Sequence, residues 1–194
     1  MRLPSRSLNI LLALLTAFLP GAALLSAQTY TLKAPIASKP ALLISIGQSA
    51  DVEMVKVLLD RSRLDYKADP QIKAGGLAAS GAKTLIIAIG GSSKGLGAAG
   101  ISADAELDRA RVLLAEAKKL GLRIIGIHVG GEARRGELSD KFIQATVSSC
   151  DYVIVVAEGN ADGLFTKLCA AAKIPLDSVE KITKAGDPLF KAFK

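Results

Sequence analysis

The sequence has 194 residues, half of them apolar, and a net charge of +7 from 25 lysines and arginines against 18 acidic residues. Only 4% of the residues are aromatic and none is tryptophan, which argues against binding of single-stranded nucleic acids or sugar polymers, because both are usually held by stacking on rings. The positive charges are spread along the chain, which favours solubility or weak anion binding over nucleic-acid binding.

The first 27 residues have the pattern of a secretory signal peptide. Two arginines precede an apolar stretch over residues 8–19, Pro20 and Gly21 interrupt it, and Ser26 and Ala27 supply small residues for cleavage. A membrane anchor that stays attached is the alternative, but a spanning helix needs about 20 apolar residues. We therefore expect cleavage after Ala27 and export of the remaining 167 of the 194 residues to the periplasm or the extracellular space.

Residues 28–40 are expected to form a leader or linker, and residues 41–194 a single α/β domain. The domain opens with "ALLISIG" (41–47), a short apolar run typical of a strand buried on both faces. A helix is predicted to begin around Asp51 with Ser49 as its N-cap. Its apolar stripe has helical spacing and consists of Val52, Val55, Leu58 and Leu59.

The middle of the chain repeats this pattern. "LDYKAD" (64–69) predicts a short edge strand, and the poorly patterned residues 71–83 predict at best a frayed helix. "KTLIIAIGG" (83–91) is the next buried strand, and a long turn is expected over residues 92–100. The best-defined helix follows, capped by Ser102 and ended by Gly121, with a core face of Leu107, Ala110, Leu114 and Ala117.

The last third begins with the strand "LRIIGIHVGG" (122–131), a charged loop over residues 132–140 and a helix. The fourth strong strand, "DYVIVVAEG" (151–159), precedes another helix. Residues 174–182 predict a short strand or an extended segment, and a short helix ends near Phe193. The apolar positions of the first two of these helices are Phe142, Ile143, Val147, Leu164, Leu168 and the alanines 170–172.

Strands that alternate with helices indicate a parallel sheet with helices on both faces. We therefore predict an α/β fold, a three-layer αβα sandwich with a mostly parallel sheet of four to five strands. The predicted strand order is 2-1-3-4-5, the flavodoxin-like variant of the Rossmann-like folds. In this order, ligands bind at the carboxyl ends of the strands, where the strand order reverses.

The segment "IGGSSKGLGAAG" (89–100) contains a G-x-G-x-x-G match from Gly95 to Gly100. A dinucleotide loop needs its first glycine at the strand end and a helix starting between the glycines, whereas all three are expected in a long loop. The Walker pattern fails because Leu96 stands where lysine is needed. Flavin is disfavoured because the four turns contain no aromatic residue before Phe165. No cofactor is therefore expected.

Four polar, glycine-rich turns meet at the expected ligand edge. Their glycines would allow a ligand close to backbone N–H groups, and their cations would suit a carboxylate or phosphate group. The alternative is that these turns only connect strands to helices, with Ser49 as a helix cap and the arginines exposed to solvent. The candidate ligand-binding residues are Gln48, Ser49, Gly91, Ser92, Ser93, Lys94, His128, Glu132, Arg134 and Arg135.

His128 is the only histidine and is expected at a strand end on the same edge. A hydrolase would pair it with a serine and a carboxylate, but "GQSAD" departs from G-x-S-x-G, and a lone histidine at a strand end is more often structural. The candidate nucleophiles and orienting acids are Ser49, Ser92, Ser93, Glu132, Glu158 and Asp162.

Cys150 and Cys169 are expected near the same end of the sheet, and an exported protein could oxidise them to a disulfide. Spacing alone does not establish the geometry that a disulfide needs, and we favour two small buried hydrophobic side chains. With one histidine and two cysteines, no metal site is expected.

The loops "GQSADVEMVK", "GGSSKGLGAAGI", "HVGGEARRGELSD" and "DGLFTK", in this order after a signal peptide, resemble an uncharacterised family of small exported bacterial proteins, a domain of unknown function. The resemblance covers the chain from about Ala41 onward and implies a bacterial exported protein, but it implies no catalytic residue. We therefore expect a protein that binds a small polar or anionic molecule without transforming it, with a membrane or envelope protein as a partner to which it could pass the molecule. A hydrolase and an interaction module of the cell envelope remain the alternatives.

Overall fold

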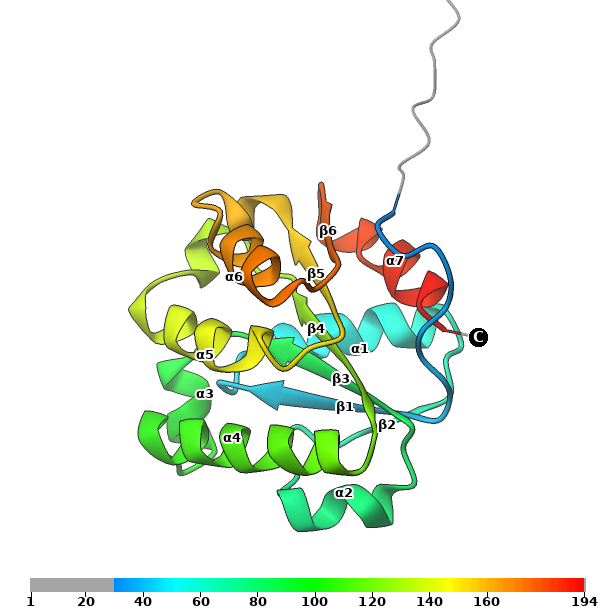
Figure 1. Ribbon diagram of the computed structural model, residues 1–194. Coiled ribbons are helices and arrows are strands. Elements are labelled where there is room, and N and C mark those ends of the chain that lie inside the picture. Colours follow the sequence, from blue (N-terminus) through cyan, green and yellow to red (C-terminus); the bar gives the residue numbers. More distant parts are fainter. Residues whose placement is uncertain (1–29, 194) are drawn as a thin grey trace, which may run out of the picture.

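The computed structural model describes residues 30–193, and the predicted signal peptide lies outside them. In this described part of the chain, six parallel strands form one sheet in the order β2-β1-β3-β4-β5-β6 (Figure 1). Their bounds are β1 (Ala41–Ile46), β2 (Tyr66–Ala68), β3 (Thr84–Ile89), β4 (Arg123–His128), β5 (Tyr152–Val156) and β6 (Leu176–Val179). The predicted α/β fold and the order 2-1-3-4-5 are confirmed.

The sheet formed by residues 30–193 has six strands, whereas four to five were predicted. Residues 176–179 pair in parallel register with residues 153–156 of β5 and form the edge strand β6. The buried carboxylate of Asp177 accepts hydrogen bonds from the Tyr152 hydroxyl and from the backbone N–H of Thr31, at 2.8 Å for the latter. Because this carboxylate has partners, a polar residue is tolerated on the inward face of the strand.

Within residues 30–193, seven α-helices cover the sheet. Their bounds are α1 (Asp51–Arg61), α2 (Ala74–Ser80), α3 (Ser93–Ala98), α4 (Ala103–Lys119), α5 (Glu137–Val147), α6 (Leu164–Ala172) and α7 (Gly186–Lys191). Residues of α1 and α7 pack on one face of the sheet, and residues of α2 to α6 pack on the other. Within residues 30–193, no helix combines the length and the apolarity that crossing a membrane requires.

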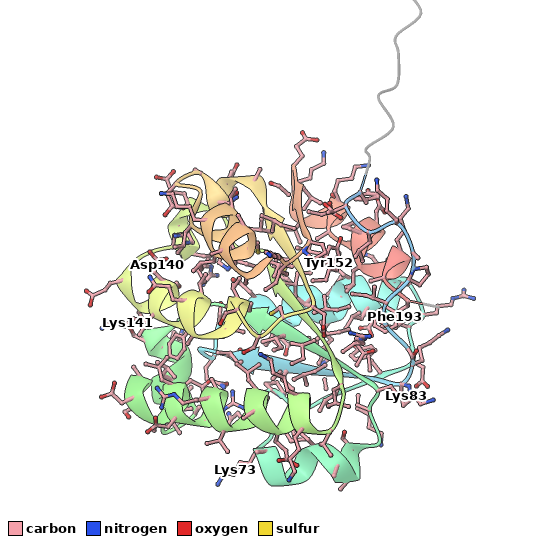
Figure 2. All side chains as sticks on the ribbon, viewed as in Figure 1. Lys73, Lys83, Asp140, Lys141, Tyr152 and Phe193 are labelled. Atoms are coloured by element: carbon pink, nitrogen blue, oxygen red, sulfur yellow. The ribbon has the colours of Figure 1, made fainter. Side chains whose placement is uncertain are left out.

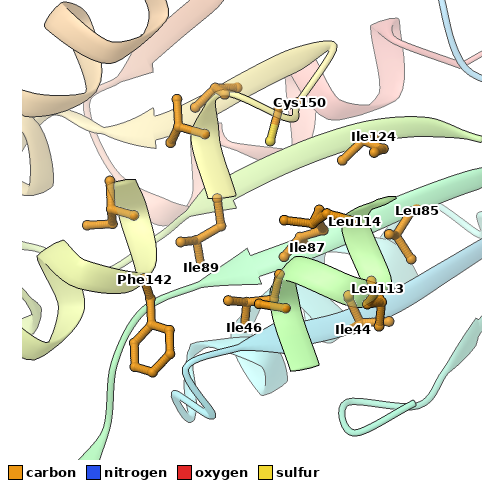
Figure 3. Close-up of a cluster of buried hydrophobic side chains, with 14 of the residues drawn as sticks. Ile44, Ile46, Leu85, Ile87, Ile89, Leu113, Leu114, Ile124, Phe142 and Cys150 are labelled. Carbon is orange, nitrogen blue, oxygen red and sulfur yellow. The ribbon is translucent and has the colours of Figure 1, made fainter. Parts of the chain in front are cut away.

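The strands are apolar because the helices bury both of their faces. Every residue of β1, β3 and β5 is buried. Figure 3 shows how alternate residues of β1 and β3, such as Ile44, Ile46 and Ile87, meet Leu113 and Leu114 of α4 in one cluster. The continuous apolar runs in the sequence therefore predicted these strands correctly.

Cys150 and Cys169 are free thiols in the structure and lie buried in the same cluster. Burial raises the pKa of Cys169 to about 11, and burial likewise raises the pKa of Cys150. Both residues therefore occupy the environment of small buried hydrophobic side chains.

One segment of the glycine motif differs from its prediction. Residues 92–100 were expected to form a loop, but Ser93–Ala98 forms the helix α3, and Ser92 caps it by accepting a hydrogen bond from the N–H of Gly95 at 3.0 Å. The cap outweighs the low helix propensity of the two glycines within the helix. The first glycine of the motif therefore lies inside a helix and not at the end of a strand.

Candidate functional site

The loops after β1 and β3 enclose a cavity at the point where the strand order reverses. It has a volume of about 330 Å³. We call it the switch-point pocket, and it is lined by Gln48, Ser49, Ala50, Val52, Ser92, Lys94, Gly95 and Ala98. Four of the predicted ligand residues therefore meet at one cavity, although more than forty positions separate the two loops in the sequence.

The loop after β1 has an unusual backbone. Gly47 has a φ of 92° and Gln48 a φ of 54°, and a residue other than glycine seldom adopts such a value. The fully buried carboxylate of Glu106 in α4 holds both residues, since its Oε1 accepts hydrogen bonds from the N–H of Gly47 at 2.9 Å and from Nε2 of Gln48 at 3.0 Å. Conformations of this kind persist where the surroundings determine them.

Arg109 completes this buried network. Its Nε donates to Oε2 of Glu106 at 2.7 Å, and its other nitrogens donate to the carbonyls of Ile72 and Ser45. Burial raises the pKa of Glu106, but the hydrogen bonds from Arg109, Gly47 and Gln48 outweigh it, and the net pKa lies below its usual value. Glu106 is therefore a buried carboxylate that fixes one wall of the switch-point pocket.

The glycines of the two loops allow the loops to pack against each other. A Cβ atom on Gly95 would collide with the carbonyl oxygen of Gln48, and one on Gly47 would collide with the carbonyl of Gly90. A Cβ atom on Gly91 would lie 2.8 Å from backbone atoms of Leu138 and Ser139. Close packing of the loops therefore explains these glycines, whereas the approach of a ligand was the explanation predicted from the sequence.

The two serine hydroxyls at the pocket each accept one hydrogen bond from a backbone N–H group. Oγ of Ser49 accepts from the N–H of Asp51 at 3.2 Å, although Ser49 is not the N-cap of α1, a position that Ala50 takes. Oγ of Ser92 accepts from Gly95. Within residues 30–193, neither hydroxyl donates a hydrogen bond, and the exposed Lys94 has no ionic partner. The pocket wall therefore presents three donors to an acceptor.

A second cavity of about 260 Å³ lies beside the loop after β4. The predicted residues Gly91, Ser93, Arg134 and Arg135 are among those that line it. Ser139 of α5 holds its wall together, since Oγ donates to the carbonyl of Arg134 at 2.7 Å and accepts from the N–H of Gly91 at 3.0 Å. Arg134 is half-exposed, and its Nε lies 3.7 Å from Oδ1 of the buried Asp51.

Arg135 connects the loop after β4 with the loop after β5 through several hydrogen bonds. Its guanidinium donates to Asp140 at 2.8 Å, to both carboxylate oxygens of Asp162 and to the carbonyl of Gly159, and only 10% of its side chain is exposed. The carboxylates raise its pKa against the opposing effect of burial. Glu132 lies nearby, at a third cavity of about 260 Å³ that Arg135 also lines. Arg135 is thus already neutralised by the protein.

His128 is fully buried and lines none of these three cavities. Its Nδ1 is 2.8 Å from the carbonyl of Ile89, which makes Nδ1 the protonated nitrogen, and its ring lies 5.2 Å from that of Phe165. Nε2 has no partner within residues 30–193 and faces Gly159. Burial lowers the pKa of His128, and the Ile89 hydrogen bond and the Asp51 carboxylate oppose it. A buried, neutral histidine is poorly placed to act as a base toward a serine at the pocket.

Three residues that hold the loops around these cavities were not predicted from the sequence, namely Glu106, Arg109 and Ser139. Glu106 lies in the first turn of α4, and its spacing to Ala110, Leu113 and Ala117 places it on the buried stripe of the helix. A charged residue on an otherwise apolar stripe was the available signal. Within residues 30–193, no group of histidine, cysteine and acidic side chains could hold a metal ion.

The fold and the edge cavities define an α/β protein with a cavity at its strand-order reversal. The chain belongs to the family described as "Domain of unknown function (DUF6305)", whose model matches residues 38–193. The predicted membership of an uncharacterised family is therefore confirmed.

A comparison with curated proteins found no match. Among solved structures, the chain is similar to a GDSL-like lipase from Bacteroides thetaiotaomicron, with 11% identity, coverage of 76% of this chain and 72% of that chain, and a TM-score of 0.34. It is also similar to the psychrotrophic esterase EstA from Pseudoalteromonas sp., in a structure inhibited by monoethylphosphonate, with 13% identity, coverage of 72% and 76%, and a TM-score of 0.31.

Proposed function

We propose that this protein binds a small polar anion, a carboxylate or phosphate compound, in the switch-point pocket and releases it unchanged. The observation that carries the proposal is the set of three unused donors, Ser49, Ser92 and Lys94, on the wall of one cavity. Because neither serine hydroxyl donates a hydrogen bond within residues 30–193, each hydroxyl hydrogen is available to donate to a ligand. Anionic oxygens are the acceptors that form the strongest hydrogen bonds with such donors.

The size and lining of the pocket limit the ligand. About 330 Å³ is near the lower end of the range for small-molecule sites, roughly 300–1,000 Å³. Ala50, Val52 and Ala98 give one part of the wall an apolar character. The proposed ligand is therefore a small solute with one anionic group and a short apolar part.

The other predicted contacts have different parts in this proposal. Arg134, Ser93 and Gly91 border the neighbouring cavity, where a longer ligand would reach them. Arg135 and His128 have structural parts. Carboxylates neutralise Arg135, and His128 is buried. With His128 outside the pocket lining, the proposal includes no chemical transformation.

The proposal also includes export. Its support is the sequence pattern of residues 1–27, which predicts that the mature protein begins at Gln28 and acts in the periplasm or the extracellular space. A solute-binding protein in that location would deliver its ligand to a membrane or envelope protein.

Native mass spectrometry of the exported chain tests both parts of the proposal. A mass that begins at Gln28 would support cleavage, and a reproducible added mass that denaturation removes would report a retained ligand. Inorganic phosphate and acetate are then titrated against the protein by calorimetry. Lys94→Ala should weaken binding of whichever anion binds by about five- to tenfold, the effect of one charge-assisted hydrogen bond.

Lys141→Ala is the matched control, because Lys141 is an exposed lysine that pairs with Glu137 at 3.0 Å and does not line the pocket. Its affinity should stay within twofold of the parent protein. Equal affinity in Lys94→Ala and in a Ser49→Ala, Ser92→Ala double variant would refute the assignment of the pocket.

A further inference from the structure

A larger concave surface lies between α2 and α4, and we call it the α2–α4 groove. Its volume is about 500 Å³, within the range for binding sites of small molecules. None of its lining residues lines the switch-point pocket. The residues that matter for the argument are Lys73, Gly75, Ile101, Ala105, Arg109 and Val112.

The α4 wall of the groove combines apolar and charged side chains, with Ala105 and Val112 one turn on either side of Arg109. Ala105, Arg109 and Val112 have the spacing of one helix face, and the rise of the helix makes this stretch about 10 Å long. Val112 is 60% exposed, the largest value among the exposed large hydrophobic residues within residues 30–193. An apolar side chain that faces an open groove is a surface that a hydrophobic ligand would cover.

Gly75 keeps the α2 side of the groove open. It lies inside a helix, where glycine is less stable than alanine, and its φ is not positive. A Cβ atom at this position would meet nothing within 4 Å, so neither packing nor backbone conformation requires glycine there. A larger side chain would extend over the groove, and its absence leaves the groove accessible.

The charges around the groove leave one cation uncompensated. Arg109 is neutralised by Glu106, and Asp108 pairs with Arg111 at 2.6 Å. Lys73, which Figure 2 shows at one end of α2, has no ionic partner within residues 30–193. We propose that the α2–α4 groove binds an aliphatic monoanion, such as a medium-chain fatty acid, with its chain on Ile101 and Val112 and its carboxylate at Lys73.

Decanoate is the probe, and acetate and 1-decanol are the comparison compounds, titrated against the exported chain by calorimetry and by NMR. Decanoate should bind, and acetate should not perturb the groove, because the apolar chain provides the favourable contact. Decanol should bind several-fold more weakly than decanoate, and Lys73→Gln should remove that difference. Amide hydrogens of α2 should exchange more slowly when decanoate is bound.

Gly75→Leu should weaken decanoate binding by about tenfold or more, because leucine fills the groove. Gly97→Leu is the matched control, since Gly97 is an exposed helical glycine with open space around its Cβ position and lies outside the groove. Ala105→Leu fills the groove from α4, in case Gly75→Leu fails to fold. Decanoate binding that survives both groove-filling variants, or no binding below the concentration at which decanoate forms micelles, would overturn the proposal.

Discussion

The two halves of the carboxyl edge of the sheet both carry glycine-rich polar loops, but the cations of these loops have different surroundings. Around the loops after β1 and β3, Lys94 and two serine hydroxyls keep unused donors at an open pocket. Around the loops after β4 and β5, Arg135 is surrounded by two carboxylates and a carbonyl, and His128 is sealed beneath Gly159. The same kind of loop therefore leaves its cation without a counter-charge in one half and neutralises it in the other.

Each half depends on one buried or nearly buried charged residue. Glu106 organises the first half from α4, and Arg135 organises the second half from the loop before α5. Substitution of these two residues would show whether the halves are independent.

The largest effect is expected from Glu106→Ala. It removes a fully buried carboxylate and leaves the guanidinium of Arg109, 13% exposed, without its counter-charge. We expect a loss of about 3–5 kcal/mol in the free energy of unfolding, measured by denaturant titration, because an uncompensated buried charge is costly. The loop of Gly47 and Gln48 should lose its order, which NMR shifts of these residues would report.

Asp108→Ala provides the matched control for Glu106→Ala. Asp108 forms the same i,i+3 type of ion pair with Arg111 on the same helix, but both side chains are more than 70% exposed, at 72% and 75%. This variant should change the free energy of unfolding by less than about 0.5 kcal/mol. Similar losses in the two variants would show that burial of the Glu106–Arg109 pair has no energetic consequence.

A smaller effect is expected from Arg135→Ala. It removes hydrogen bonds to Asp140, Asp162 and Gly159, and we expect it to lower the free energy of unfolding by about 2 kcal/mol. Arg134→Ala should change this free energy by less than about 0.5 kcal/mol, since Arg134 is half-exposed and its contact with Asp51 is long, at 3.7 Å. Both are measured by urea denaturation, and equal effects would contradict the assignment of Arg135 as the structural arginine.

The fold could be predicted from the sequence because apolar periodicity reports burial directly. β1, β3, β4 and β5 are continuous apolar runs, and Ser102 caps α4 as its spacing predicts. The helix α3 was missed because two of its six residues are glycines, and its stability depends on the Ser92 cap and on close packing against Gln48. The residues within α3 do not reveal this packing, because its partner Gln48 lies more than forty positions away in the sequence.

The candidate site could be predicted only as a set of loops. The residues of the switch-point pocket follow from the strand order, which brings Ser49 and Ser92 together. The different environments of Arg134 and Arg135 do not follow, because the carboxylate of Asp162 reaches Arg135 from a loop 27 positions away. Adjacent residues of identical type can be told apart only when the tertiary partners are known.

The smallest effect is a pH dependence that arises in the β4–β5 half. Burial lowers the pKa of His128 below its ordinary value of 6.5, and the nearby groups are Asp51, Arg135 and Asp140. The unfolded chain therefore takes up a proton at a higher pH than the folded protein does. As the pH falls below 6.5, the unfolded state binds more protons and the free energy of unfolding decreases, by at most about 1.4 kcal/mol per pH unit.

His128→Gln should flatten this slope between about pH 5 and pH 6.5, because glutamine can donate to the carbonyl of Ile89 but does not titrate. The chain contains no other histidine, so untagged protein has no second imidazole in this range. Urea denaturation at several pH values gives both slopes. Equal slopes in the two proteins would mean that His128 is protonated as easily in the fold as in water, and that the β4–β5 half is open to solvent like the switch-point half.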